Sequence, residues 1–277
     1  MSKPLEGQVA LVTGAAGVLC SVFVKHLLQS GAKVVLMGRT EAKLEALKEK
    51  CANDGLNKTL VCQADVTSRK DLVAARIKIH ETWGKVNLLI NGAGGNQPGA
   101  VSAYETLTPG ADLSASFFGM DADAYRSVMD LNLIGTLLPC QVFGADMIES
   151  GEGNIINISS LSAILPLTKV AGYSNAKAAI DSFTKWLSVH LAPSAIRVNA
   201  IAPGFFATEQ NKFLLFEKDG KTLTERGNKI VSQTPFGRFG KHEELLTSLT
   251  FLADPASTFV TGTVIVVDGG FSAYSGV

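Results

Sequence analysis

The sequence predicts an α/β fold built on a doubly wound, parallel sheet of seven strands, with helices on both faces of the sheet. Short runs of β-branched and other apolar residues recur along the chain, at Val9–Thr13, Lys33–Met37, Leu60–Gln63, Leu88–Asn91, Asn154–Ile158, Arg197–Ile201 and Val264–Val267. Each run is nearly continuous in apolar residues, which is typical of strands covered on both faces. Segments with helical spacing separate the runs, and strands joined by helical crossovers run parallel.

The helical segments carry apolar residues three and four positions apart, so that one face of each helix can pack on the sheet. The clearest cases are Leu44, Leu47 and Cys51 between the second and third strands, and Ala176, Ile180, Phe183, Leu187 and Leu191 between the fifth and sixth. No internal repeat, low-complexity stretch or linker interrupts this alternation. We therefore expect residues 1–277 to form a single domain.

Two segments break the alternation, at about residues 95–120 and 205–240. The first is rich in small residues and contains the turn signal Thr108-Pro109-Gly110. The second contains Asp219-Gly220 and Thr234-Pro235, pairs that favour turns, around two short helical stretches. Both follow the carboxyl ends of strands, the edge where open α/β sheets bind ligands. We expect a loop insertion in the first segment and a substrate lid in the second.

The composition argues against several classes of partner. The chain has 25 Lys and Arg against 25 Asp and Glu, so neither a nucleic acid nor an anionic membrane surface is expected to bind. Its four cysteines are scattered, with no CxxC pair or His cluster, so we expect neither a disulfide framework nor a metal site. No export segment precedes the first strand, and no apolar run approaches the roughly 20 residues that span a bilayer. A cytoplasmic location is therefore expected.

The first candidate binding motif is the turn Thr13-Gly14-Ala15-Ala16-Gly17-Val18-Leu19-Cys20, which follows the first strand and opens a helix. Small residues let the backbone turn sharply, and a helix N-terminus offers N–H donors and a positive dipole end to a pyrophosphate. The residues predicted to bind a dinucleotide here are Gly14, Ala16, Gly17, Val18 and Leu19. The alternative is a purely structural turn, since many strand-to-helix turns need glycine.

The end of the second strand bears on the choice of dinucleotide. Folds that bind NAD usually place Asp or Glu there to hold the ribose 2′-hydroxyl, whereas this chain has Gly38 and Arg39. Because Arg39 suits a 2′-phosphate, we expect NADP to be preferred over NAD. The alternative is that Arg39 is solvated, or stacks on the adenine of either cofactor.

Tyr173 and Lys177 are the strongest candidates for chemistry. Residues four positions apart share one helix face, and a nearby ammonium lowers the pKa of a tyrosine toward the range of a general acid or base. On its own this spacing also occurs in ordinary surface pairs. Ser159 and Ser160 follow the fifth strand, where a hydroxyl can donate to a substrate carbonyl, and they favour a catalytic site.

Together these motifs resemble the short-chain dehydrogenase/reductase family, over about residues 8–270. The family's Tyr-x-x-x-Lys pattern corresponds to Tyr173 and Lys177, with Ser160 at the usual interval. Further matches are Asn91, Ala93 and Gly94 after the fourth strand, Asn132 in an Asn-x-x-Gly-Thr pattern, Asp65 and Val66 after the third strand, and Pro203, Gly204, Phe206 and Thr208 after the sixth. The resemblance implies a Rossmann-type fold in which all of these except Ser160 and Asn132 bind NADP or NAD.

The resemblance also implies roles in carbonyl reduction. Tyr173 would protonate the carbonyl oxygen as hydride arrives from the nicotinamide, and Lys177 would lower the Tyr173 pKa and hold the nicotinamide ribose. Ser160 would polarise the carbonyl, and Asn132 would hold a water that links Lys177 to solvent. The chain departs from the family's first motif, Thr-Gly-x-x-x-Gly-x-Gly, at Val18 and Cys20. We expect Cys20 to be a packed, inert thiol rather than a redox sensor.

A narrower resemblance concerns the substrate. Segments 91–98, 117–136, 203–212 and 267–272 are similar to the branch of D-mannonate oxidoreductases, or fructuronate reductases, which interconvert D-fructuronate and D-mannonate. The polar residues that would meet such a sugar acid are Asn96, Gln97, Ser162, Gln210, Asn211 and Arg226. For each of these alone, the alternative is an ordinary loop residue. Apolar lid residues such as Phe205 and Phe206 pack the lid or line an apolar pocket.

Two other functions stay open at this point. One is the same mechanism on another carbonyl, such as a gluconate-type acid or a 3-oxoacyl thioester. The other is a non-catalytic, dinucleotide-binding regulator, against which the intact Ser160, Tyr173 and Lys177 count. Members of the family usually form tetramers through their fourth and fifth helices and their C-terminal strand region, so a homotetramer is expected.

Overall fold

The computed structural model describes residues 3–208 and 212–276 and contains the predicted parallel sheet. Its strand order is β3-β2-β1-β4-β5-β6-β7, and every neighbouring pair is parallel. The strands are β1 (Val9–Thr13), β2 (Lys33–Gly38), β3 (Thr59–Gln63), β4 (Leu88–Asn91), β5 (Gly153–Ile158), β6 (Ile196–Pro203) and β7 (Val264–Val267). All seven predicted strands are confirmed. The chain reverses its direction of progress across the sheet between β1 and β4, which opens a crevice at their carboxyl ends.

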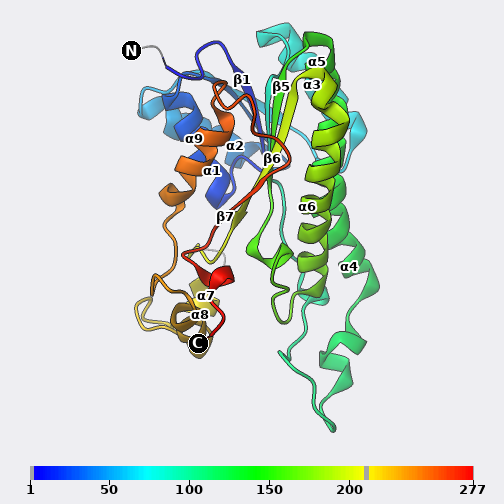
Figure 1. Ribbon diagram of the computed structural model, residues 1–277, viewed down its shortest axis with the longest axis vertical. Coiled ribbons are helices and arrows are strands. Elements are labelled where there is room, and N and C mark those ends of the chain that lie inside the picture. Colours follow the sequence, from blue (N-terminus) through cyan, green and yellow to red (C-terminus); the bar gives the residue numbers. More distant parts are fainter. Residues whose placement is uncertain (1–2, 209–211, 277) are drawn as a thin grey trace.

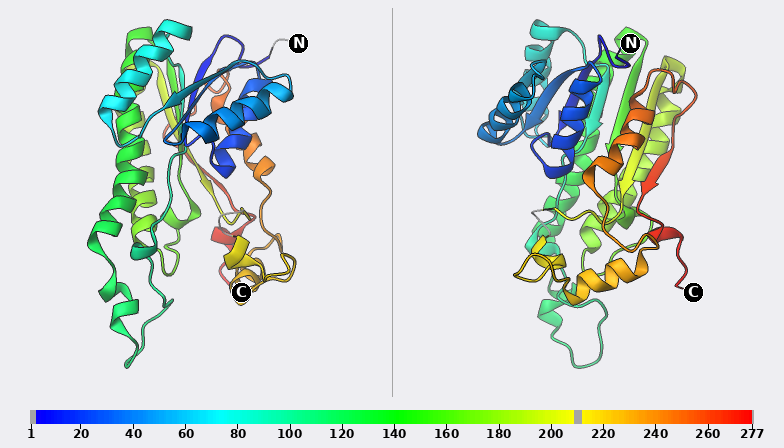
Figure 2. Two further views of the ribbon diagram at one scale, coloured as in Figure 1. Left: turned by 180° about the vertical axis from the view of Figure 1, so that it is seen from behind. Right: turned by 90° about the vertical axis from the view of Figure 1, so that its left-hand side faces the viewer.

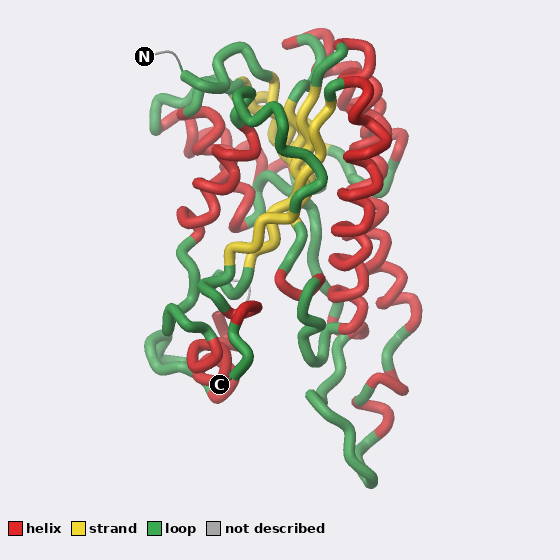
Figure 3. Tube along the Cα trace, in the orientation of Figure 1, coloured by secondary structure: helices red, strands yellow, loops and turns green. Residues whose placement is uncertain are grey.

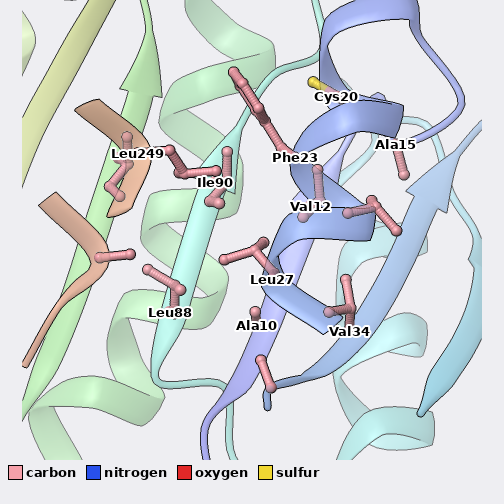
Figure 4. Packing of buried hydrophobic residues seen from close by; sticks show 14 of the residues in the cluster. Ala10, Val12, Ala15, Cys20, Phe23, Leu27, Val34, Leu88, Ile90 and Leu249 are labelled. Carbon is pink, nitrogen blue, oxygen red and sulfur yellow. The ribbon is translucent and has the colours of Figure 1, made fainter. Parts of the chain in front are cut away.

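Helices cover both faces of the sheet, as predicted (Figures 1 and 2). The first face carries α1 (Val18–Gln29), α2 (Glu41–Asn53) and α9 (Leu246–Ala253), and the second carries α3 (Arg69–Trp83), α5 (Gly135–Ser150) and α6 (Ala171–Leu191). On the first face Phe23 and Leu27 of α1 pack against Val12 and Ile90 of the central strands (Figure 4). This core fixes the N-terminus of α1 beside the crevice.

Strand β7 departs from the prediction that every strand is covered on both faces. It lies at the edge of the sheet, and its residues are only partly buried. Val266 is 36% exposed. An apolar edge strand with an exposed face is a surface that another chain can cover.

A continuous helical segment, Ala122–Ser150, joins α4 (Ala122–Met129) to α5 through a π-helical turn at Asp130–Ile134. By length and mean hydropathy this segment would suffice to cross a membrane. Here it packs against β4, β5, α3 and α6, and 56% of its most apolar stretch is buried. It is therefore a core helix of this fold, and its apolar character serves the packing.

The two irregular segments extend past the same edge of the sheet (Figures 1 and 3). Within 95–120, the regular structure consists of three short 3₁₀ turns, at Pro98–Ala100, Leu113–Ala115 and Phe117–Gly119. The described part of 205–240 contains α7 (Lys212–Leu215) and α8 (Glu225–Gln233), which match the two short helical stretches expected there. Both segments thus lie at the mouth of the crevice.

Candidate active site

A cavity of about 490 Å³ opens at the carboxyl edge of the sheet. It is lined by the turn after β1, by the ends of β2, β4 and β5, by α6 and by the loop after β6. The predicted residues that it brings together are Gly14, Ala16, Gly17, Val18, Leu19, Arg39, Ala93, Gly94, Ser160, Tyr173, Lys177, Pro203, Gly204, Phe206 and Thr208. Residues almost 200 positions apart in the sequence thus face one space.

The turn between β1 and α1 forms one wall of the cavity. Gly14 has a φ of +63°, and a Cβ there would lie 2.9 Å from the Cα of Ala93, so this position requires glycine. Gly17 precedes the first turn of α1 in an ordinary extended conformation, with a φ of −70°. The first backbone N–H groups of α1 therefore face the cavity, where they can bind an anion.

Cys20 fills the space between α1 and the turn after β4. Its Sγ lies 3.7 Å from the carbonyl oxygen of Gly92, and a Cβ on Gly92 would lie only 2.1 Å from that Sγ. Thr13 draws the same turn inward, since its Oγ1 accepts hydrogen bonds from the Gly92 and Ala93 N–H groups at 3.0 and 3.2 Å. Glycine in the strand turn thus makes room for the thiol on the helix.

The thiol of Cys20 is buried, at 3% exposure. Burial raises its pKa to about 12, although the charge of Lys177 opposes this rise. A thiol with such a pKa is not a thiolate at neutral pH. The expected packing of this thiol is confirmed, and its inertness stays a prediction.

The end of β2 supplies positive charge to the far end of the cavity. Gly38, Arg39, Thr40 and Lys43 line this part, and no carboxylate is among the described residues that line the cavity. Thr40 is the N-cap of α2, but its side chain makes no capping hydrogen bond. Two cations, a hydroxyl and a helix N-terminus together suit a phosphate group.

Tyr173 and Lys177 face the cavity from α6, with the Lys177 Nζ 5.5 Å from the centre of the Tyr173 ring. Nζ donates a hydrogen bond to the carbonyl oxygen of Ile158, at 2.8 Å. That oxygen is at the end of β5, next to the serines, so the hydrogen bond anchors α6 to the strand that carries Ser160.

The pKa of Tyr173 differs from the sequence-based expectation. In the protein alone burial raises the pKa of the Tyr173 phenol, and a hydrogen bond from Ser160 only partly opposes that rise. Lys177 is also buried, and burial lowers its pKa to about 8. Burial disfavours the charged form of each group, so it raises the pKa of the phenol and lowers the pKa of the ammonium.

Asn132 lies in the π-helical turn and is fully buried. Its Nδ2 donates to the carbonyl oxygens of Gly95 and Val128, both at 2.8 Å, and its Oδ1 accepts from the Gly95 N–H at 3.2 Å. These bonds attach the turn after β4 to the helix. π-helical turns often occur at functional sites because they turn one side chain inward.

Several predicted residues do not line the cavity. Val66 is buried, the Asp65 carboxylate accepts hydrogen bonds from Thr67, and the Asn91 side chain donates to Asn157 within the core. Of the residues predicted to meet the substrate, those that the structure describes do not line the cavity either. Asn96 and Gln97 are exposed, Ser162 is buried, and Arg226 lies on α8. Gln210 and Asn211 lie outside the described residues.

Sequence reasoning missed Thr40 and Lys43. They lie one and four positions after Arg39, at the start of α2. A helical projection of that first turn would have placed them on the same side of the cavity. It also missed Glu105 of the insertion, because the residues of α8 that pair with it are more than 100 positions away in the sequence.

Residues 14–272 match the family model for enoyl-(acyl carrier protein) reductase. The uncharacterized oxidoreductase UxuB of Bacillus subtilis is 47% identical over 278 residues, which cover 100% of this chain and 99% of that protein. The structure of a proposed D-mannonate oxidoreductase from Haemophilus influenzae with bound NAD is 43% identical, with a TM-score of 0.93 and coverage of 99% and 98% of the two chains. A gluconate 5-dehydrogenase from Burkholderia cenocepacia in complex with NADP and tartrate is 28% identical, with a TM-score of 0.83 and 98% coverage of both chains.

Proposed function

The chain belongs to the short-chain dehydrogenase/reductase family, and from this premise we propose that it interconverts D-fructuronate and D-mannonate, with Tyr173 as the general acid and base. The observation that carries the proposal is that one cavity holds both the glycine-containing turn after β1 and the side chains of Ser160, Tyr173 and Lys177. A cavity that only bound a dinucleotide would have no use for a buried phenol beside an ammonium. This argues against the non-catalytic alternative.

The cavity wall fits a nicotinamide dinucleotide. The turn at Gly14 and the N-terminus of α1 would hold the pyrophosphate, Arg39 the adenosine end, and the loop at Pro203, Gly204, Phe206 and Thr208 the nicotinamide end. Asp65, Val66 and Asn91, which do not line the cavity, would also contribute to binding the dinucleotide. When bound, the dinucleotide supplies or accepts the hydride.

The side chains of the protein would transfer the proton and polarise the substrate carbonyl. The Ser160 hydroxyl would hold and polarise the substrate carbonyl, and the Tyr173 phenol would protonate its oxygen on reduction. In the reverse direction Tyr173 would remove the proton from the hydroxy acid. Lys177 would hold the ribose and stabilise phenolate, while Asn132 would position a water that connects Lys177 to solvent.

The substrate assignment rests on similarity and on polarity at the cavity mouth. The H. influenzae protein, a proposed D-mannonate oxidoreductase, aligns with this chain over almost its full length. Arg226 and the amides of Asn96 and Gln97 belong to the two segments at the mouth, where a polyol with a carboxylate would meet them. Gluconate-type acids are the second candidate, because the gluconate 5-dehydrogenase shares the fold and was crystallised with tartrate.

We propose NADP as the preferred cofactor. Arg39 and Lys43 provide two cations where NAD-binding folds usually carry a carboxylate. The similar structures hold NAD in one case and NADP in the other, so the fold accommodates both, and the proposed preference rests on these residues.

We also propose that the protein works as a homotetramer in the cytoplasm. Two separate apolar surfaces support this assembly. One lies on α6, where Trp186 and Val189 are 60% and 76% exposed. The other includes Phe251 of α9, Phe259 in the loop after α9, and Val266 of β7. Large exposed apolar groups of this kind mark surfaces that bind other proteins.

The substrate test follows nicotinamide absorbance with purified protein and D-fructuronate, in parallel with 5-keto-D-gluconate and a 3-oxoacyl thioester, each with NADPH and NADH. We expect D-fructuronate to give the highest kcat/KM, with NADPH ahead of NADH. A higher kcat/KM for the ketogluconate or the thioester would keep the mechanism and overturn the substrate. Absence of turnover with all three, together with dinucleotide binding, would favour a regulator.

A further inference from the structure

Glu105, in the 95–120 insertion, lies against two cations of α8. Its Oε2 accepts a hydrogen bond from the Lys229 Nζ at 2.5 Å, and its Oε1 is 3.9 Å from the Arg226 Nη1. An ion pair between residues more than 100 positions apart therefore joins the insertion to the 205–240 segment. The bond to Lys229 holds α8 beside the insertion, whereas the longer approach of Arg226 is not a hydrogen bond.

Lys169 brings a third cation to the same carboxylate. Its φ is +74°, in the left-handed region that a residue with a side chain rarely adopts, and its carbonyl oxygen accepts a hydrogen bond from the Ser102 N–H at 2.8 Å. The hydrogen bond from Lys229, together with the charges of Lys229, Lys169 and Arg226, lowers the pKa of Glu105. Strained backbone of this kind concentrates at binding and catalytic sites.

Two of these cations have donors to spare. Within residues 3–208 and 212–276, neither the Arg226 guanidinium nor the Lys169 ammonium donates a hydrogen bond to another residue. The Arg226 side chain is also 31% exposed, so it is partly sheltered yet reachable from solvent. A sheltered guanidinium with a free fork of N–H donors suits a carboxylate.

The chain limits the distance between Lys169 of this cluster and Tyr173. Lys169 is four residues before Tyr173, so their Cα atoms can be no more than about 14 Å apart, at roughly 3.5 Å per residue. The long side chains of lysine and arginine can cover most of such a span. Within this cluster, one acid and three cations leave an excess of two positive charges.

We propose that Arg226 and Lys169 form the subsite for the carboxylate of the substrate, and that Glu105, by holding Lys229, fixes α8 so that Arg226 faces this subsite. This rests on the proposed function, because it assigns residues to the acid group of that substrate. Arg226 and Lys169 are specificity residues for the anionic substrate, and Glu105 is a positioning residue that acts through α8.

The test compares D-fructuronate with D-fructose, in which a hydroxymethyl group replaces the carboxylate. In Arg226→Gln and Lys169→Gln we expect the ratio of kcat/KM for D-fructuronate to that for D-fructose to fall about 10- to 100-fold, since a charged hydrogen bond is lost. Arg126→Gln is the matched control, because it removes the same charge from an exposed position on α4 that is 72% exposed. Glu105→Gln should raise KM for D-fructuronate while leaving the dissociation constant for NADPH unchanged.

Calorimetric binding of D-mannonate and tartrate to the NADP-loaded protein separates this subsite from the proposed function. If the wild type binds either hydroxy acid and Arg226→Gln binds it at least about tenfold more weakly, the subsite stands even if D-fructuronate is not turned over. In that case only the substrate proposal fails. Equal binding by the wild type and Arg226→Gln, or an unchanged selectivity ratio, overturns the subsite whatever the substrate.

Discussion

The hydroxyl of Tyr173 is the group on which the proposed proton transfer depends. Tyr173→Phe removes only that hydroxyl and leaves the ring in place beside Lys177. We expect kcat to fall about 1,000-fold, within the range for loss of a general acid, with the dissociation constant for the dinucleotide changed less than about threefold. Steady-state kinetics and a fluorescence titration of NADPH measure the two quantities, and substantial residual turnover would contradict the assignment.

Burying the Lys177 ammonium lowers the free energy of unfolding of the protein. Because the folded-state pKa is about 8 and the ordinary value is 10.5, the unfolded chain binds more protons between these pH values. Wild-type stability should therefore rise as the pH increases from about 8 to 10.5. Below pH 8 the full cost of burying the ammonium remains, about 3 kcal/mol.

Lys177→Met tests whether the buried ammonium destabilises the fold. At pH 7 we expect the variant to unfold at higher urea than the wild type, with a gain of about 2 kcal/mol after loss of the hydrogen bond to the Ile158 carbonyl oxygen. The gain should disappear near pH 10.5, and turnover should be lost at every pH. A variant less stable than the wild type at pH 7 would show that the buried ammonium is better compensated than its pKa indicates.

The contact between α1 and the turn after β4 determines how closely the helix approaches the cavity. In Gly92→Ala the new methyl group would meet the Cys20 Sγ at 2.1 Å, so we expect a loss of about 1–3 kcal/mol in the free energy of unfolding. Adding Cys20→Ala removes that sulfur and should recover most of the loss. Urea unfolding of both single variants and the double variant measures the coupling, and strictly additive effects would contradict direct contact.

We expect the end of β2 to determine the proposed preference for NADP. A Cβ on Gly38 would meet only the Leu44 Cδ2 at 3.5 Å, so Gly38→Asp fits without displacing the strand. The new carboxylate should repel a 2′-phosphate and accept a hydrogen bond from a ribose hydroxyl, which we expect to shift the NADPH/NADH ratio of kcat/KM toward NADH by about tenfold or more. An unchanged ratio would contradict the role given to this strand end.

The elements differ in how far the sequence predicts them. Each central strand is a continuous apolar run, and the local pattern was enough to locate all seven. The exposure of β7 was not predictable, because it depends on the strand's position at the sheet edge. The pairing of Glu105 with Lys229 is equally invisible in sequence, since two solvated charges on distant segments meet only after folding.

The positions of the residues proposed as catalytic were predictable, because Tyr173 and Lys177 share a local spacing and Ser160 follows a predicted strand. The sign of the Tyr173 pKa change was not, because it depends on burial and not on the identity of the neighbour. Asp65, Val66 and Asn91 do not line the cavity in the protein alone, so their predicted contact with the dinucleotide stays a prediction.

At the level of the assembly, the proposed tetramer would use the two apolar surfaces as two contacts between subunits. Helices α6 and α9 lie on opposite faces of the sheet (Figure 1), and Phe259 lies in the loop between α9 and β7. A protein with two separate self-associating surfaces forms a dimer of dimers, and most such tetramers have closed symmetry. Disrupting one surface should therefore give dimers, and disrupting both should give monomers.

Light scattering at micromolar concentration tests this expectation with Val189→Glu and Phe259→Asp, singly and together. We expect a tetramer for the wild type, dimers for each single variant and a monomer for the double variant, because a buried unpaired carboxylate costs more than either apolar contact provides. Phe118→Glu is the control, since Phe118 is 69% exposed on the insertion and belongs to neither surface. A wild-type monomer, or tetramers in both single variants, would contradict the proposed assembly. Tetramers of Phe118→Glu, together with dimers of the other two, would locate the contacts on the two surfaces.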